Sequence, residues 1–143
     1  MAKVIFEDYS IQVKEAIDSK INAVLEECAG ELESAVKRNT RVGAINGGKT
    51  KNSWKHRVID SEHKAIIGSP LENAIWEEFG TGEHALEGNG RKGGWWYKNP
   101  HPTGEHDKFI FTYGKTPSRA FYKAYMSLKN KIIQRIQNSL KGL

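Results

Sequence analysis

The sequence is poor in cysteine, in proline and in long apolar runs. Its 143 residues include one cysteine and four prolines, and 38% of them are hydrophobic. The single thiol, Cys28, excludes an internal disulfide. No apolar run approaches the roughly 20 residues of a membrane span, and the first residues lack the apolar stretch of a signal peptide. We expect one domain over residues 1–143, made and used in the cytoplasm without a membrane partner.

Acidic residues are missing from two stretches, although the net charge is only +5. Residues 37–57 and residues 115–143 each carry seven Lys/Arg and no acid, whereas residues 11–36 carry two lysines against six acids. Charge sorted in this way predicts matched faces, either within the molecule or between copies of it.

The sequence also lacks a recognisable catalytic or metal-binding constellation. His84, His101 and His106 fit no zinc spacing and are interpreted as solvated loop residues. Glu77 and Glu78 are the only acid–base candidates, and such pairs at a helix end more often cap, pair with a basic neighbour or face solvent. We therefore expect no enzymatic activity, no cofactor and no bound metal. An enzyme with its active site in a loop is kept as an alternative hypothesis, ranked after a virion protein and a nucleic-acid-binding protein.

One segment matches the sequence pattern of a nucleotide-binding loop. Residues 43–50 (GAINGGKT) fit the pattern G-x-x-x-x-G-K-T, which works when a buried strand precedes it and a helix follows. Here the preceding residues 37–41 are charged and end a helix, and the following residues 51–58 alternate like a strand. We interpret the match as accidental.

Hydrophobic periodicity predicts an α+β fold. Two long amphipathic helices are expected to pack on a small, mostly antiparallel sheet of about four strands, with one short helix and two long Gly-rich loops. The two long helices, one acidic and one basic, should share a sheet face or pack on each other. The predicted elements are helices at 11–38, 71–79 and from 116 onward, strands at 4–6, 53–60, 63–69, 95–97 and 109–113, and loops at 39–52 and 80–94.

Several positions carry specific expectations. Cys28 falls on the apolar stripe of the first helix, which predicts a buried thiol. In the short helix, Ala74, Ile75 and Phe79 should face inward, and Gly80 should cap the end. Thr116 should be the N-cap of the last helix, with Pro117 at its first position.

The basic stretch 37–57 has two readings. With Trp54 and His56, and together with the basic C-terminal helix, it could hold a nucleic-acid backbone by phosphate contact and aromatic stacking. The other reading is a loop that becomes ordered on an acidic protein partner, which we favour because the base-reading modules are absent. The residues available for nucleic-acid contact are Lys37, Arg38, Arg41, Lys49, Lys51, Lys55 and Arg57.

The segment 95–97 (WWY) predicts a strand with Trp95 and Tyr97 on one face and Trp96 on the other. One face can join the core, and the other must be covered by a loop, a helix or another subunit. Trp96, or the Trp95/Tyr97 pair, is thus a candidate interface anchor, and core packing of both faces is the alternative.

Three motifs follow one another along the chain: 48–54 (GKTKNSW), 74–82 (AIWEEFGTG) and 116–121 (TPSRAF). Each joins an aromatic residue to a glycine, proline or basic stretch, as expected where a framework meets docking loops. In this order they resemble the small tail-component family of long-tailed double-stranded DNA phages, the head–tail joining or tail-completion proteins. The proline–aspartate pair often found before the first loop of that family is missing here.

The resemblance implies a non-enzymatic virion protein at the neck, assembled in the host cytoplasm into a ring, typically sixfold. Its implied partners are the head connector or stopper and the tail tube or tail terminator, with DNA met only indirectly. We further hypothesise that the free protein is monomeric or weakly associated, because ordering two Gly-rich loops opposes assembly without a template. The expected interface residues are Lys49, Lys51, Trp54, Glu77, Glu78, Thr81, Trp96 and Arg119.

Overall fold

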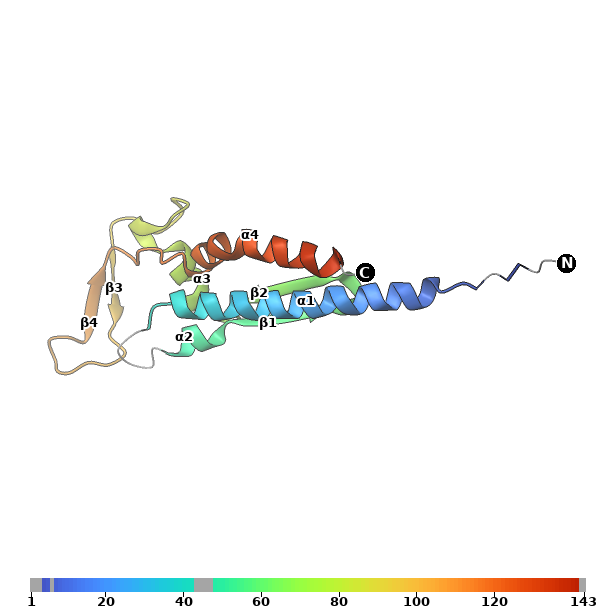
Figure 1. Cartoon of the computed structure of the whole chain (residues 1–143). Helices are drawn as coiled ribbons and strands as arrows, with labels where there is room; N and C mark the ends of the chain where they lie inside the picture. The colour runs from blue at the N-terminus through green and yellow to red at the C-terminus, as the bar shows by residue number, and fades with distance from the viewer. Residues whose placement is uncertain (1–3, 6, 43–47, 142–143) are drawn as a thin grey trace.

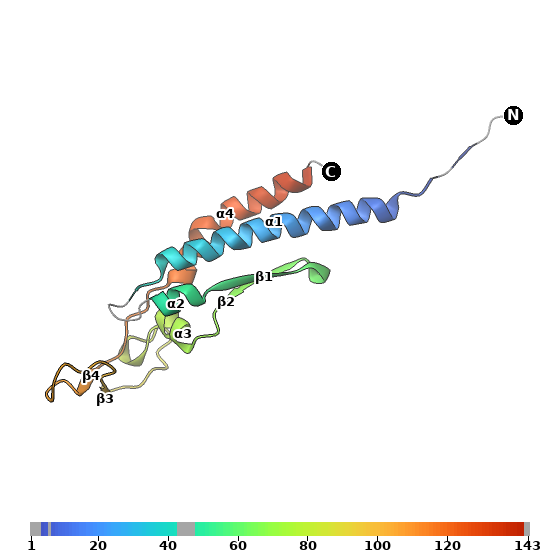
Figure 2. The same ribbon diagram turned by 90° about the horizontal axis from the view of Figure 1, so that it is seen from below.

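The computed structural model describes residues 4–5, 7–42 and 48–141. The molecule is elongated, with α1 and α4 side by side, the β1–β2 hairpin along α1, and the β3–β4 hairpin at one end (Figures 1 and 2). Figure 2 shows α1 between α4 and the β1–β2 hairpin. The elements are α1 (Ser10–Asn39), α2 (Gly48–Ser53), β1 (Lys55–Ile59), η1 (Asp60–Glu62), β2 (Lys64–Gly68), α3 (Glu72–Phe79), η2 (Gly82–His84), β3 (Trp95–Lys98), β4 (Phe109–Thr112) and α4 (Ala120–Lys141).

The predicted first helix is confirmed as α1. It ends at Asn39. The next residue, Thr40, has an extended backbone, and its hydroxyl donates a 2.7 Å hydrogen bond to the carbonyl of Val36. Cys28 is buried in its apolar stripe, as predicted, and burial raises the pKa of the thiol. In the described part of the chain, no helix is both long and apolar enough to span a bilayer.

The core lies where the end of α1 meets α3 and the start of α4. Val36 is fully buried there, together with Trp54, Ala74 and Ala124. The indole of Trp54 stacks on Phe121 with 5.9 Å between ring centroids. Aromatic and small residues thus fill a compact joint between elements that are far apart in the sequence.

Two acidic residues of α1, Glu27 and Glu31, form ion pairs with the basic helix α4. Glu31 accepts hydrogen bonds from Lys131 at 2.9 Å and from Arg135 at 2.6 Å. Arg135 also lies 3.3 Å from Glu27. The expectation that the two long helices pack on each other is confirmed, and part of their segregated charge is paired inside one chain.

The α+β class is confirmed, but the described strands form two separate antiparallel hairpins rather than one sheet. In the first, His56 pairs with Ile67; in the second, Trp96 pairs with Phe111. Hydrophobic alternation predicts a strand but does not say which strand it pairs with. Here α1 runs along β1–β2, while β3–β4 lies beyond the end of the helices (Figure 1).

Two predictions near the start of the chain and after α1 are wrong. Val4 and Ile5 belong to no strand and are exposed, since none of the described strands pairs with them. Phe6 of that prediction lies outside the described residues. Part of the predicted loop 39–52 is the helix α2, whose last residue, Ser53, donates a 2.5 Å hydrogen bond to the carbonyl of Thr50. Residues 43–47, which hold most of the nucleotide-like pattern, lie outside the described residues.

Candidate protein-interaction surface

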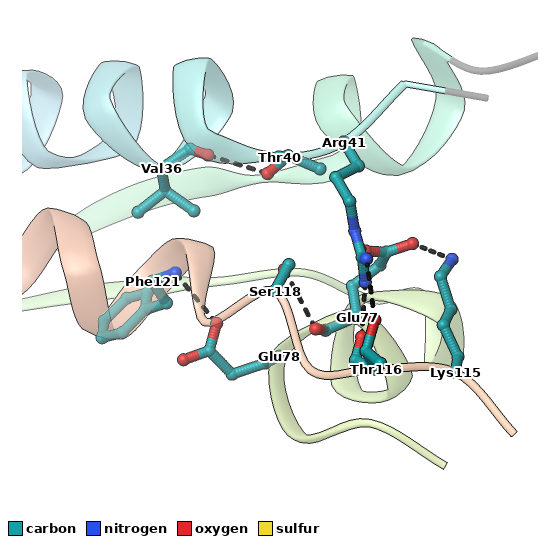
Figure 3. A network of polar contacts seen from close by, with 9 residues as sticks. All are labelled: Val36, Thr40, Arg41, Glu77, Glu78, Lys115, Thr116, Ser118 and Phe121. Carbon is teal, nitrogen blue, oxygen red and sulfur yellow. Dashed lines mark hydrogen bonds and ion pairs between the residues drawn. The ribbon is translucent and has the colours of Figure 1, made fainter. Parts of the chain in front are cut away.

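The carboxylate of the buried residue Glu78 caps the N-terminus of α4. Glu78 accepts a hydrogen bond from the backbone N–H of Phe121 at 2.9 Å (Figure 3). It accepts a second one from the backbone N–H of Tyr122 at 3.0 Å. These groups are among the N–H groups that a helix start leaves without an intrahelical partner. Thr116 is therefore not the N-cap, and α4 begins at Ala120.

The segment before α4 is held away from a helical path. The backbone N–H of Ser118 donates a 2.7 Å bond to the carbonyl of Glu77, and the Ser118 hydroxyl donates to the same oxygen at 3.0 Å. Arg119 has a positive φ of 56°, which interrupts a right-handed helix. Pro117 consequently precedes the helix instead of opening it.

Glu77 anchors the other side of this junction. Its carboxylate accepts a 3.0 Å hydrogen bond from Nε of Arg41 and forms an ion pair with Lys115 (Figure 3). Arg41 also donates a 2.6 Å bond to the carbonyl of Thr116. Glu77 and Glu78 are each only 7% exposed. Both carboxylates therefore act within the chain: Glu78 caps the start of α4, and Glu77 pairs with basic residues.

The bonds made by these two carboxylates fix how α3 is turned. Ala74 is buried as predicted, but Ile75 is 59% exposed and Phe79 is 40% exposed, so the prediction that they face inward is wrong. Since Glu77 and Glu78 point into the molecule, the apolar pair points outward. Together with Phe121, Ile75 and Phe79 line an open cavity of about 280 Å³ between the end of β2, α3 and the start of α4, which we call the apolar cavity.

Residues 80–82, which we call the Gly-Thr-Gly element, pair with the chain that leads into α4. The N–H of Thr81 donates to the carbonyl of Lys115 at 2.9 Å, and the N–H of Lys115 donates to the Thr81 hydroxyl at 2.8 Å. Gly82 has φ of +60°, and a Cβ there would lie 2.2 Å from the carbonyl oxygen of Tyr113. Only glycine allows this close approach.

One face of the β3–β4 hairpin is aromatic and open. Trp96 is 65% exposed and Phe109 is 60% exposed. Trp96 contacts Phe111 edge-on at 5.3 Å between centroids, and Phe111 contacts Tyr113 at 5.1 Å. We call these four residues the aromatic face. Sequence reasoning named only Trp96, although the alternation of Phe109, Phe111 and Tyr113 carries the same signal.

The opposite face of the hairpin is turned toward the Gly-Thr-Gly element. A Cβ at Gly82 would lie 2.8 Å from the ring of Trp95. Trp95 and Tyr97 line an open groove with Trp76 and Thr81. The half-buried Trp95 therefore belongs to the inner face, and Trp96 points away from the molecule.

The other expected interface residues occupy different surroundings. Trp54 is buried in the core. The guanidinium of Arg119 lies over the rings of Tyr122, at 4.5 Å, and Phe79, at 5.5 Å. Lys49 is exposed on α2 and Lys51 is partly exposed. Whether any of these residues contacts a partner stays a prediction.

The basic stretch divides into paired and unpaired residues. Lys37 pairs with Glu33 at 2.8 Å, and Arg41 is held by Glu77. Trp54 is buried, so its ring is not available to stack on a base. In the part of the chain that the structure describes, no ion pair is formed by Arg38, Lys49, Lys51, Lys55 or Arg57.

Sequence reasoning missed the contacts that fasten β1 to α1. The ring of His56 lies between Glu26, 2.5 Å from Nε2, and Glu33, which contacts Nδ1. The hydrogen bonds to Glu26 and then to Glu33 raise the pKa of His56. Across residues 4–5, 7–42 and 48–141, no three His, Cys, Asp or Glu side chains are grouped so as to hold a metal ion.

Comparison with known proteins gives one family. Residues 6–80, just over half of the chain, match the family described as "Bacteriophage HK97-gp10, putative tail-component". No curated protein and no solved structure matches the chain. The matched range ends at Gly80, so it contains α1, α2, the β1–β2 hairpin and α3, and it excludes β3, β4 and α4. The chain therefore belongs to the HK97-gp10-like family of structural bacteriophage tail components.

Proposed function

We propose that the protein completes the phage neck by joining a DNA-filled head to a tail. In this role it forms a ring, sixfold as is typical of such joints, between the head connector or stopper and the tail tube or tail terminator. Assembly takes place in the host cytoplasm, and the finished ring is part of the virion. The role is structural and needs neither a cofactor nor a catalytic group.

The observation that carries the proposal is the open aromatic face, combined with family membership. Large aromatic residues are enriched at the centres of protein interfaces. Trp96 and Phe109 are more than half exposed in the isolated chain, and contiguous exposed apolar patches commonly mark interaction sites. A tail component with such a surface is suited to bind other virion proteins.

The internal charge matching supports an apolar mode of assembly. Glu31 of α1 is engaged by Lys131 and Arg135 of α4. These charges are therefore not free to attract a neighbouring subunit. In the proposed ring the exposed apolar residues supply the main contact between subunits, and charged residues that form no ion pair within the described part of the chain orient it.

Electron microscopy of phage particles made without this protein tests the proposed function. Separate filled heads and finished tails are expected, and wild-type protein supplied from a plasmid should restore joined particles. Normal tailed particles in the absence of the protein would refute the joining role.

A second candidate function is nucleic-acid binding, favoured by the outer face of the β1–β2 hairpin. His56 points toward α1, so its neighbours Lys55 and Arg57 lie on the opposite face, and the register places Lys64 there too. All three are exposed. A salt-dependent shift of labelled duplex DNA that is lost on reversing these charges would support this function. Absence of binding near physiological salt would count against it.

A further inference from the structure

We propose that the aromatic face of one copy docks in the apolar cavity of a second copy, head to tail. This contact rests on the proposed function, because it would be the repeating contact of the ring. It specifies which two surfaces of the chain meet, and it makes the contact heterologous, as a ring that closes by rotation requires.

The aromatic face cannot reach its own apolar cavity while the hairpin keeps its place. The ring of Trp95 lies against the Gly82 side of the hairpin, so Trp96 projects to the other side. The aromatic face is thus directed away from the body of its own chain. Only another molecule can cover it.

The apolar cavity offers a matching receptor. Its volume of about 280 Å³ is lined by the exposed Ile75 and Phe79 and by the half-buried Phe121. An open apolar hollow of this size is suited to an aromatic side chain inserted as an anchor. Trp96 and Phe109 are the most exposed aromatic side chains of the aromatic face.

Charge complementarity favours this pairing. Lys98 lies on the same face of β3 as Trp96, is exposed, and has no ion pair in the described residues. Glu72 lies one turn before Ile75 on α3, is exposed, and is likewise without an ion pair there. Docking the aromatic face in the cavity brings Lys98 toward Glu72. A symmetric pairing of two aromatic faces would instead place lysine near lysine.

The size of the aromatic face fits a repeating, weak contact. A fully buried aromatic side chain removes ~150–250 Å² from solvent, so four half-exposed ones offer roughly 300–500 Å². A standard stable interface buries about 800 Å² on each partner. One such contact would leave the free protein weakly associated, whereas a closed ring uses both surfaces of every subunit.

Charge reversal tests the contact in purified full-length protein. We expect Lys98→Glu and Glu72→Lys each to weaken self-association about tenfold in sedimentation equilibrium, and the double variant to recover most of the loss. Lys64→Glu is the matched control, because it reverses an exposed strand lysine on the other hairpin and should have no effect. A double variant as weak as the single ones, or an equal loss in Lys64→Glu, would overturn the proposal.

Cysteine cross-linking tests the same geometry without relying on affinity. In a Cys28→Ala background, a chain carrying both Lys98→Cys and Glu72→Cys should give an oxidative ladder of dimers, trimers and higher species at rising protein concentration. Each single-cysteine chain should remain uncross-linked. Dimers from Lys98→Cys alone would show that two aromatic faces meet, and no ladder from the double variant would also overturn the proposal.

The two hypotheses fail separately. Suppose that the double charge-reversal variant does not recover self-association and that the double-cysteine chain gives no cross-linked ladder, while particles lacking the protein still show unjoined heads and tails. Then this contact is wrong and the joining role stands. If particles lacking the protein have normal tails, the joining role is wrong, and the ladder still decides whether the two surfaces meet.

Discussion

The carboxylate of Glu78 lies 2.9 Å from the backbone nitrogen of Phe121, so a side chain of α3 supplies the hydrogen-bond acceptor at the start of α4. The two residues are 43 positions apart in the sequence. Through this contact the short helix α3, which the Gly-Thr-Gly element follows, is fastened to the long C-terminal helix. The same contact leaves Ile75 and Phe79 on the outside, where they line the apolar cavity.

Loss of this acceptor should destabilise the protein. Glu78→Ala leaves the N–H groups of Phe121 and Tyr122 without an acceptor, and we expect the free energy of unfolding to fall by about 1–3 kcal/mol. Glu78→Gln keeps one acceptor oxygen and should cost less. Urea denaturation followed by circular dichroism measures both changes. Glu87→Ala, at an exposed loop position, is the control; an equal loss there would remove the special role of Glu78.

Gly82 should be irreplaceable for steric reasons. Gly82→Ala adds a Cβ that would lie 2.2 Å from the carbonyl oxygen of Tyr113. Gly88 has a similar positive φ of 71° with nothing within 4 Å. Gly88→Ala should therefore show only the backbone cost of about 1–2 kcal/mol, and Gly82→Ala should cost roughly 1–3 kcal/mol more. Thermal unfolding compares the two, and equal losses would contradict the close packing at Gly82.

The stability of the protein should depend on pH through His56. Its folded-state pKa is raised above 6.5 by Glu26 and Glu33, so its contribution is complete below pH 6.5 and is lost as the pH rises through the raised pKa. His56→Gln should lower the melting temperature most on the acidic side of this window and least above it. His101→Gln, at an exposed loop position, is the matched control for loss of an imidazole. A His56→Gln effect that does not vary with pH would argue against the ion pairs.

The ion pairs between α1 and α4 should be weak and sensitive to salt. Glu31→Gln removes the partner of Lys131 and Arg135, and because these side chains are partly solvated we expect a loss below about 1 kcal/mol. The difference from wild type should shrink as salt is added. Denaturation at low and high ionic strength measures it, with Glu15→Gln, farther toward the start of α1, as the control. A loss of several kcal/mol would mean that these charges are effectively buried.

Particular residues show how far the sequence could be read. The periodicity of α1 and the alternation of β1 and β2 are local signals, and they predicted those elements within a residue or two. The start of α4 could not be read in this way. Thr116 and Pro117 are residues typical of a helix N-terminus. However, the hydrogen bonds of Ser118 to Glu77 and the positive φ of Arg119 keep this segment out of the helix, and Glu78 supplies the acceptor for the first N–H groups of α4. Trp54 was expected at an interface or on a nucleic acid, and its burial depends on Phe121, which lies 67 positions later.

The sequence by itself determined the α+β class, the acidic and basic helices, the glycines of the Gly-Thr-Gly element and the family likeness. Each of these follows from which residue types recur at which spacing over a short stretch of the chain. Tertiary structure decided that the four described strands form two hairpins, that Glu77 and Glu78 face inward, and that Ile75 and the aromatic face point outward. These outcomes depend on which distant groups satisfy each buried carboxylate and backbone N–H. Such pairing lowers the free energy only when the whole chain has come together, so no local pattern can predict it.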